Sequence, residues 1–120
     1  AIMQEVGVAA INNGLTDVVV KVIIETAYLS DKMKRLAAQI VAASGADFIK
    51  TSTGFAPAGA TVEDVALLRQ EAPDALAVKA SGGIRTLQDA LDMLNAGASR
   101  LGMSSSVAVM KEAESGALQE

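Results

Sequence analysis

Four short runs of apolar and β-branched residues recur along the chain, separated by longer segments of helical character. The runs extend from Val18 to Glu25, Asp47 to Ser52, Leu76 to Ala80 and Arg100 to Met103. They are continuously apolar rather than alternating, which is typical of parallel strands covered on both faces. This order of strands and helices predicts one parallel sheet with right-handed crossovers.

The segment after Ser30 predicts a helix that ends at Gly45, a residue suited to the left-handed conformation of a helix stop. Its apolar positions fall on one helical stripe, which consists of Met33, Leu36, Ala37, Ile40 and Val41. Residues 1–13 predict one more helix, closed by Gly14.

Two later helices begin with capping-box signatures, in which a threonine is followed three positions later by an acidic residue. The pairs are Thr61 with Asp64 and Thr86 with Asp89. Pro73 ends the first of these helices and Gly97 the second, and a last helix is expected to begin between Ser104 and Ser106. The chain is thus predicted to be one domain, with a leading helix and turn in residues 1–17 and four strand-helix units in residues 18–120.

Composition narrows the chemistry, because the 120 residues include no His and no Cys. Imidazole bases, thiol nucleophiles and the usual zinc ligand sets are therefore excluded, and we predict no metal and no cofactor. The net charge of -4 argues against a nucleic-acid partner. No apolar run approaches the roughly 18 residues that span a membrane, so we expect a cytoplasmic protein.

Two lysines lie at corresponding places in neighbouring apolar runs. With a period of two, the residues that share a face are Phe48, Lys50 and Ser52 on one strand and Ala77, Lys79 and Ser81 on the next. Two ammonium groups held together repel, so the pKa of at least one should be lowered, which would supply a nucleophile or base near neutral pH. The alternative is that each lysine extends into solvent or pairs with a carboxylate.

Turns rich in glycine and hydroxyl groups follow three of the predicted strands. They are Thr53-Gly54, Ser81-Gly82-Gly83 and Gly102-Met103-Ser104-Ser105. Such turns let backbone amides approach a phosphate, and the helix N-termini that follow two of them add donors. The candidate phosphate-binding residues are Thr53, Gly54, Ser81, Gly82, Gly83, Gly102, Ser104 and Ser105. The alternative is that the glycines only satisfy tight strand-to-helix geometry.

Four segments together resemble the deoxyribose-phosphate aldolase family, whose members join acetaldehyde and glyceraldehyde 3-phosphate through a lysine Schiff base. The segments are residues 21–26, 45–55, 78–86 and 100–105, and the resemblance extends over about residues 18 to 110. It implies that Lys50 is the Schiff-base lysine and that Lys79 lowers its pKa and assists proton transfer. It also implies that phosphate is bound by Gly54, Gly82, Gly83, Gly102, Ser104 and Ser105.

The family folds as a (β/α)8 barrel of about 250 residues, whereas this chain has strands for only half of one. The resemblance therefore implies the C-terminal half of a TIM-type barrel, (β/α)4, without the strand that carries the family's proton-relay aspartate. Four parallel strands leave two unpaired edges, so we predict a homodimer that closes a ring with twofold symmetry.

The function implied is the reversible cleavage of 2-deoxyribose 5-phosphate to acetaldehyde and glyceraldehyde 3-phosphate, impaired by the missing aspartate. The alternative is a catalytically inactive phosphate-binding half-barrel scaffold that dimerises. The expected ligand of both is a phosphorylated sugar or a phosphate ion. A flavodoxin-like open sheet is a third alternative, but ligand turns at every carboxyl end fit a barrel segment better.

Overall fold

The computed structural model describes residues 2–119, in which four strands and five α-helices alternate along the chain. The strands are β1 Lys21–Ile23, β2 Phe48–Lys50, β3 Ala77–Ser81 and β4 Arg100–Gly102. The helices are α1 Ile2–Asn12, α2 Asp31–Ser44, α3 Val62–Glu71, α4 Leu87–Ala96 and α5 Ser106–Gln119, with a short 3-10 turn at Thr26–Tyr28. The predicted strand-helix order is confirmed.

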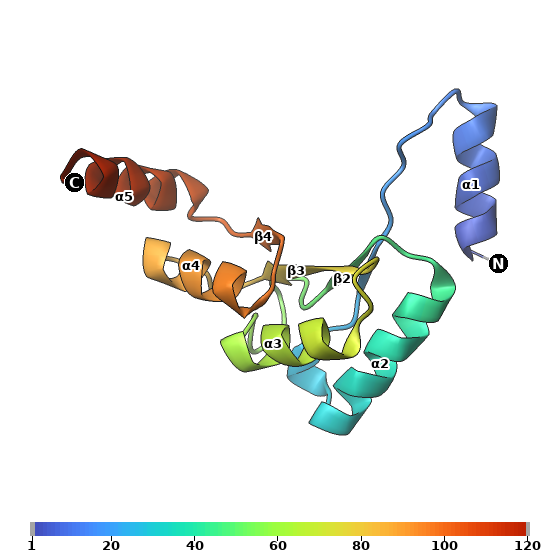
Figure 1. Ribbon diagram of the computed structural model, residues 1–120, viewed down its shortest axis with the longest axis horizontal. Coiled ribbons are helices and arrows are strands. Elements are labelled where there is room, and N and C mark those ends of the chain that lie inside the picture. The colour runs from blue at the N-terminus through green and yellow to red at the C-terminus, as the bar shows by residue number, and fades with distance from the viewer. Residues whose placement is uncertain (1, 120) are drawn as a thin grey trace.

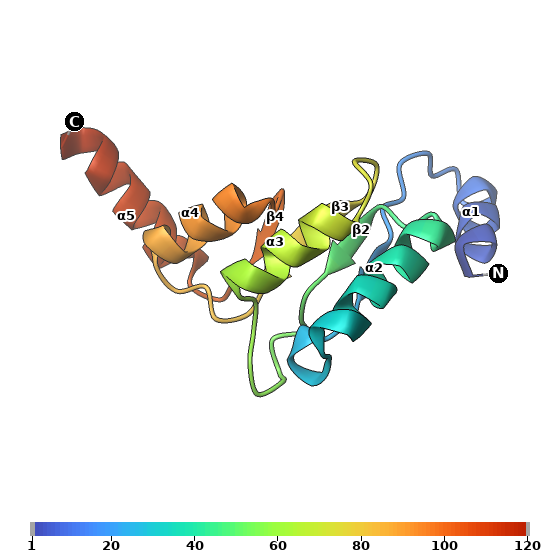
Figure 2. The ribbon, with the colours of Figure 1, turned by 60° about the horizontal axis from the view of Figure 1, so that its bottom comes forward.

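All four strands are parallel, and each pairs with the next one in the sequence, in the order β1-β2-β3-β4. Helices α2, α3 and α4 lie along one side of this sheet, while α1 and α5 extend at opposite ends of the molecule (Figures 1 and 2). The chain is therefore an α/β half-barrel, as predicted, with one sheet face covered by helices.

Burial along the strands distinguishes the two faces of the sheet. Ile49, Val78 and Ala80 are 0% exposed and form the core with the helices. The residues between them on the strands are only half-buried or exposed. We call this second side the open face, and it consists of Lys21, Ile23, Phe48, Lys50, Ala77, Lys79 and Arg100.

The predicted helix caps are present, except that the capping box at Thr61 is incomplete. The Ser30 hydroxyl accepts a hydrogen bond from the Met33 N–H, and Gly45 ends α2 with a φ of 83°. Thr86 and Asp89 form a complete capping box.

The capping box predicted at Thr61 forms only in part. The Thr61 hydroxyl accepts from the Asp64 N–H at 3.1 Å, as expected. The Asp64 carboxylate accepts from the Lys34 ammonium of α2 at 2.6 Å. The acidic side chain therefore joins two helices and makes no return bond to its own helix start.

The apolar stripe predicted on α2 matches the buried side of the helix only at Val41. The buried residues are Lys34, Ala38 and Val41. The larger apolar members of the stripe are exposed, namely Met33 at 49%, Leu36 at 47% and Ile40 at 61%. The physical reason is that α3 is the helix on which α2 mainly packs, which leaves the other side of α2 exposed.

The first strand is also shorter than predicted. Val18 and Val19 are exposed, and β1 begins at Lys21. The Val20 N–H donates to the Asp47 carboxylate at 2.8 Å, so a side chain occupies the place that a strand partner would take. No helix within residues 2–119 is long and apolar enough to cross a membrane.

Candidate active site

The sheet register brings the two candidate lysines side by side. Lys50 at the end of β2 is the Cα partner of Lys79 in β3, and both lie on the open face. Lys79 is in turn the partner of Arg100 in β4. Lys21 on β1 completes the set, so each strand contributes one cation to the open face.

These cations shift the acidity of the central lysine. Burial and the positive charges of Lys50, Lys21 and Arg100, in that order of effect, lower the pKa of Lys79 below its usual value. The ion pairs found in residues 2–119 are made by Lys34 and Arg35, both on α2. The open face therefore concentrates positive charge that no carboxylate of the described residues neutralises.

An aromatic ring holds two of the cations. The Phe48 ring centroid lies 4.7 Å from the Arg100 guanidinium carbon and 5.6 Å from the Lys21 ammonium. Both distances are within the range of cation-π attraction. Because Ala77 is the strand partner of Phe48, its small side chain leaves room for Arg100 to reach across β3.

The turns after β2, β3 and β4 meet in one cleft of about 480 Å³ at the carboxyl ends of the strands. The cleft contains Lys50 and every predicted phosphate residue except Ser105. Lys79 is not among its lining residues. Lys50 is thus the amine that a ligand in the cleft meets first, and Lys79 lies beside it.

Close backbone packing fixes the two glycine turns against each other. The Ala60 N–H donates to the carbonyl oxygens of Ser81 and Gly82 at 3.0 and 3.1 Å. Gly59 lies so close to Gly82 that a Cβ there would collide with the Gly82 carbonyl. The loop after β2 therefore folds over the turn after β3 and brings Gly54 next to Gly82.

Ser81 in β3 is the strand partner of Gly102 in β4, and its hydroxyl lies close to the Gly102 backbone. A Cβ at position 102 would collide with the Ser81 Oγ, so a larger residue there would require the Ser81 hydroxyl to move. The Ser81 hydroxyl is buried and has no hydrogen-bond partner among the described residues. A buried hydroxyl without a partner is costly, and a ligand oxygen in the cleft would satisfy it.

Thr53 has a different environment from the other predicted phosphate residues. Its N–H donates to the Glu25 carboxylate at 3.2 and 3.3 Å, and its hydroxyl donates to the same group at 2.7 Å. Glu25 adopts a left-handed φ of 54°, which is uncommon for a residue with a side chain. Thr53 thus anchors the turn after β2 to the end of β1.

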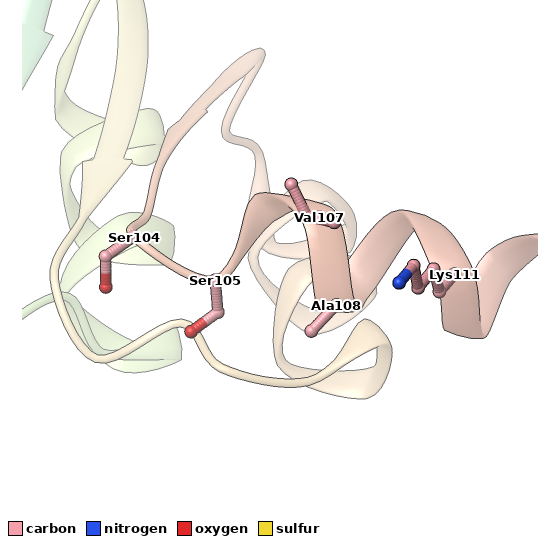
Figure 3. A pocket seen from close by; sticks show the side chains of 5 residues that line it. All are labelled: Ser104, Ser105, Val107, Ala108 and Lys111. Carbon is pink, nitrogen blue, oxygen red and sulfur yellow. The ribbon is translucent and has the colours of Figure 1, made fainter.

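Ser104 and Ser105 lie where β4 leads into α5. Figure 3 shows Ser104 in the connecting loop, Ser105 just before this helix and Lys111 further along it. Together with Val107 and Ala108 they line a shallow hollow of about 360 Å³. Ser104 belongs to this hollow and to the main cleft. Ser105 therefore lies beside the cleft rather than in it.

Four cleft residues were not among the sequence-based candidates: Phe55, Ile84, Arg85 and Met103. Arg85 is the informative one, because it adds a cation directly after the Ser81-Gly82-Gly83 turn. The sequence signal for Arg85 was its position within residues 78–86, a segment that resembles the aldolase family. Within the described residues no group of three acidic side chains is placed to hold a metal ion.

Comparison with known proteins places this geometry in context. A model of the DeoC/LacD family aldolase matches residues 6–112. The deoxyribose-phosphate aldolase of Rhodospirillum rubrum is 53% identical over 107 residues, which are 89% of this chain and 45% of that protein. The chain spans about half the length of the curated relatives it matches.

Solved structures give the same result. An aldolase called QR15 superposes with a TM-score of 0.79 at 49% identity, over 82% of this chain and 44% of that one. The tetrameric deoxyribose phosphate aldolase from Aeropyrum pernix gives 0.78 at 38% identity, over 92% of this chain and 47% of that one.

Proposed function

This chain belongs to the DeoC/LacD aldolase family, and we propose that Lys50 forms a Schiff base with an aldehyde. The reaction proposed is the reversible cleavage of 2-deoxyribose 5-phosphate to acetaldehyde and glyceraldehyde 3-phosphate. The observation that carries the proposal is the position of Lys50, which lines the cleft and is the strand partner of Lys79.

The two amines have complementary tasks in this reaction. Because the pKa of Lys79 is lowered by burial and by three neighbouring cations, part of Lys79 is neutral at a pH where an ordinary lysine is charged. The Lys50 amine in its unprotonated form adds to the aldehyde carbon, with neutral Lys79 beside it as a base. Loss of water then gives the iminium, which withdraws electrons while Lys79 or water moves the α-proton.

The remaining cleft residues fit the phosphate of the substrate. Gly54, Gly82 and Gly83 have positive φ angles and line the cleft with their backbone. Arg85 adds a guanidinium, and the unpaired Ser81 hydroxyl adds a donor. Backbone amides together with a guanidinium are the groups that proteins use for phosphate oxygens.

The rate of this chain alone should be low. The described residues that line the cleft include no carboxylate. A positioned acid-base group typically contributes about 10² to 10⁴-fold to the rate. Formation of the Schiff base needs only the amines, so a covalent adduct is expected even where turnover is slow.

The proposal predicts that acetaldehyde followed by borohydride leaves one ethyl group on Lys50, detected by peptide mass spectrometry. Lys50→Met should abolish this label. Lys32→Met removes an exposed lysine of α2 and is the matched control, in which the label should persist. If the native chain carried no ethyl group on Lys50, or if Lys50→Met were labelled to the same total extent as the native chain, the proposed nucleophile would be contradicted.

The carboxylate-free cleft also supports the second candidate, an inactive phosphate-binding scaffold. This candidate predicts that phosphate raises the melting temperature while acetaldehyde and borohydride leave no adduct. An adduct at Lys50 excludes it. The homodimer predicted from the sequence belongs to either version and is tested by light scattering of the chain alone.

A further inference from the structure

We infer that Glu25, which does not line the cleft, is a positioning residue for the turn after β2. It acts through Thr53 and sets the affinity of the cleft for a phosphate group, but it takes no part in Schiff-base formation at Lys50. This inference rests on the phosphate site proposed above. It adds to that site a residue from outside the three turns rich in glycine and hydroxyl groups.

The first observation is the backbone conformation of Glu25. Its φ of 54° and ψ of 71° lie in the left-handed region, and among the described residues no other side-chain-bearing residue has a positive φ. On one side of it the Ile24 N–H donates to the Lys50 carbonyl at 3.1 Å. On the other side the Thr26 N–H donates to the Thr51 carbonyl at 2.9 Å. The end of β2 therefore holds Glu25 in a conformation that is concentrated at binding and catalytic sites.

The second observation is the chain of hydrogen bonds that begins at the Glu25 carboxylate. This carboxylate accepts from the Thr53 N–H and, at 2.7 Å, from the Thr53 hydroxyl. The Thr53 Oγ in turn accepts from the Phe55 N–H at 3.2 Å. The N–H groups on both sides of Gly54 are thus occupied, whereas the Gly54 N–H has no hydrogen-bond partner among the described residues. Because Gly54 lines the cleft, its N–H is available to a ligand.

The charge of Glu25 makes the inference testable by the direction of an effect. A carboxylate close to an anion site repels the anion. If Glu25 acted on phosphate only through its charge, removal of that charge would tighten phosphate binding. If Glu25 instead fixes the turn that carries the Gly54 N–H, its removal weakens phosphate binding. The two roles therefore predict changes of opposite sign.

The first experiment is an NMR titration with inorganic phosphate, followed through the backbone amide signals. Glu25→Ala should weaken phosphate binding about five- to tenfold, because the Gly54 N–H is no longer held in place. The phosphate-induced shift of the Gly54 signal should shrink more than that of Gly83. The matched control Glu63→Ala removes an exposed carboxylate at the start of α3 and should bind phosphate like the native chain.

A more conservative variant keeps the test valid if Glu25→Ala does not fold, which the dispersion of the NMR spectrum shows. Glu25→Gln keeps the length of the side chain and one acceptor oxygen but removes the charge. It should weaken phosphate binding by a smaller factor than Glu25→Ala. Phosphate binding that is unchanged or tighter in the folded variants would overturn the inference.

The second experiment examines the same link from Thr53. Thr53→Val removes the hydroxyl and should weaken phosphate binding, while Thr53→Ser should keep more of the affinity. The double variant Glu25→Ala, Thr53→Val should bind about as weakly as Glu25→Ala alone, because both changes break one linkage. Losses that multiply in the double variant would contradict an action of Glu25 through Thr53.

Labelling of Lys50 by acetaldehyde and borohydride separates this inference from the proposed Schiff base. Acetaldehyde carries no phosphate, so Glu25→Ala should be labelled at Lys50 to the same extent as the native chain. Loss of this label in Glu25→Ala alone would overturn the inference, since Glu25 would then act on the amine. If the native chain binds no phosphate, the inference is overturned together with the phosphate site, and the Lys50 label still reports on the Schiff base.

Discussion

Two lysines on opposite sides of the sheet have pKa values shifted in opposite directions. Lys34 lies between α2 and α3, and its hydrogen bond to Asp64 raises its pKa although burial acts the other way. Lys79 lies on the open face, where burial and three cations lower its pKa. On the helix-covered side, the Asp64 carboxylate neutralises Lys34. On the open face, no carboxylate of the described residues neutralises Lys79.

The apolar residues show the same contrast. Ile49 on β2 points to the helices and is 0% exposed, whereas Ile23 on β1 lies on the open face and is 44% exposed. One side of the sheet is therefore a finished core. The other side is a partly exposed surface on which each strand places one cation.

The largest expected effect tests the core side of this contrast. Ile49→Ala should lower the free energy of unfolding by about 3 kcal/mol, because a fully buried methyl-bearing side chain is lost and a cavity remains. Ile23→Ala is the same chemical change on the open face and should cost below about 1 kcal/mol. Urea unfolding measures both, and equal losses would contradict the assignment of the two faces.

A smaller effect is expected from the buried ion pair. Lys34→Met leaves the Asp64 carboxylate between α2 and α3 without its counter-charge, and should cost about 2 kcal/mol. Arg35→Met breaks a more exposed pair with Glu71 and should cost about 0.5 kcal/mol or less. If urea unfolding gives the two variants similar stabilities, the covered side does not depend on its internal counter-charge.

The smallest effect is the pH dependence of stability due to Lys79. Its pKa is lower in the folded chain than the ordinary value of 10.5, so between the two values the unfolded chain binds more protons. Stability should therefore rise with pH through that window. Lys79→Met should remove this part of the slope, whereas Lys32→Met should keep it. The measurement is urea unfolding at several pH values up to about 10.5. The same dependence of stability on pH in the native chain, Lys79→Met and Lys32→Met would refute the idea.

The sequence predicts well what local signals determine. The helix starts at Ser30 and Thr86 and the stop at Gly45 depend on side-chain and backbone groups within a few residues. The shared face of Lys50 and Lys79 follows from the period of two, together with a parallel neighbour.

What the sequence did not predict depends on distant partners. The pair Lys34–Asp64 joins residues 30 positions apart, and nothing near either residue indicates it. The inward position of Arg100 required the register between β3 and β4. The α2 stripe was identified correctly as apolar, but helical periodicity cannot tell whether a neighbouring element exists to bury it.

The most direct test of the account is an NMR titration of the Lys79 side chain, followed through its Cε signal. A midpoint below the ordinary lysine value of 10.5 is predicted for the chain alone, because burial and three cations surround the ammonium and no carboxylate of the described residues pairs with it. A midpoint at or above 10.5 would contradict the account, since it would require a counter-charge on the open face.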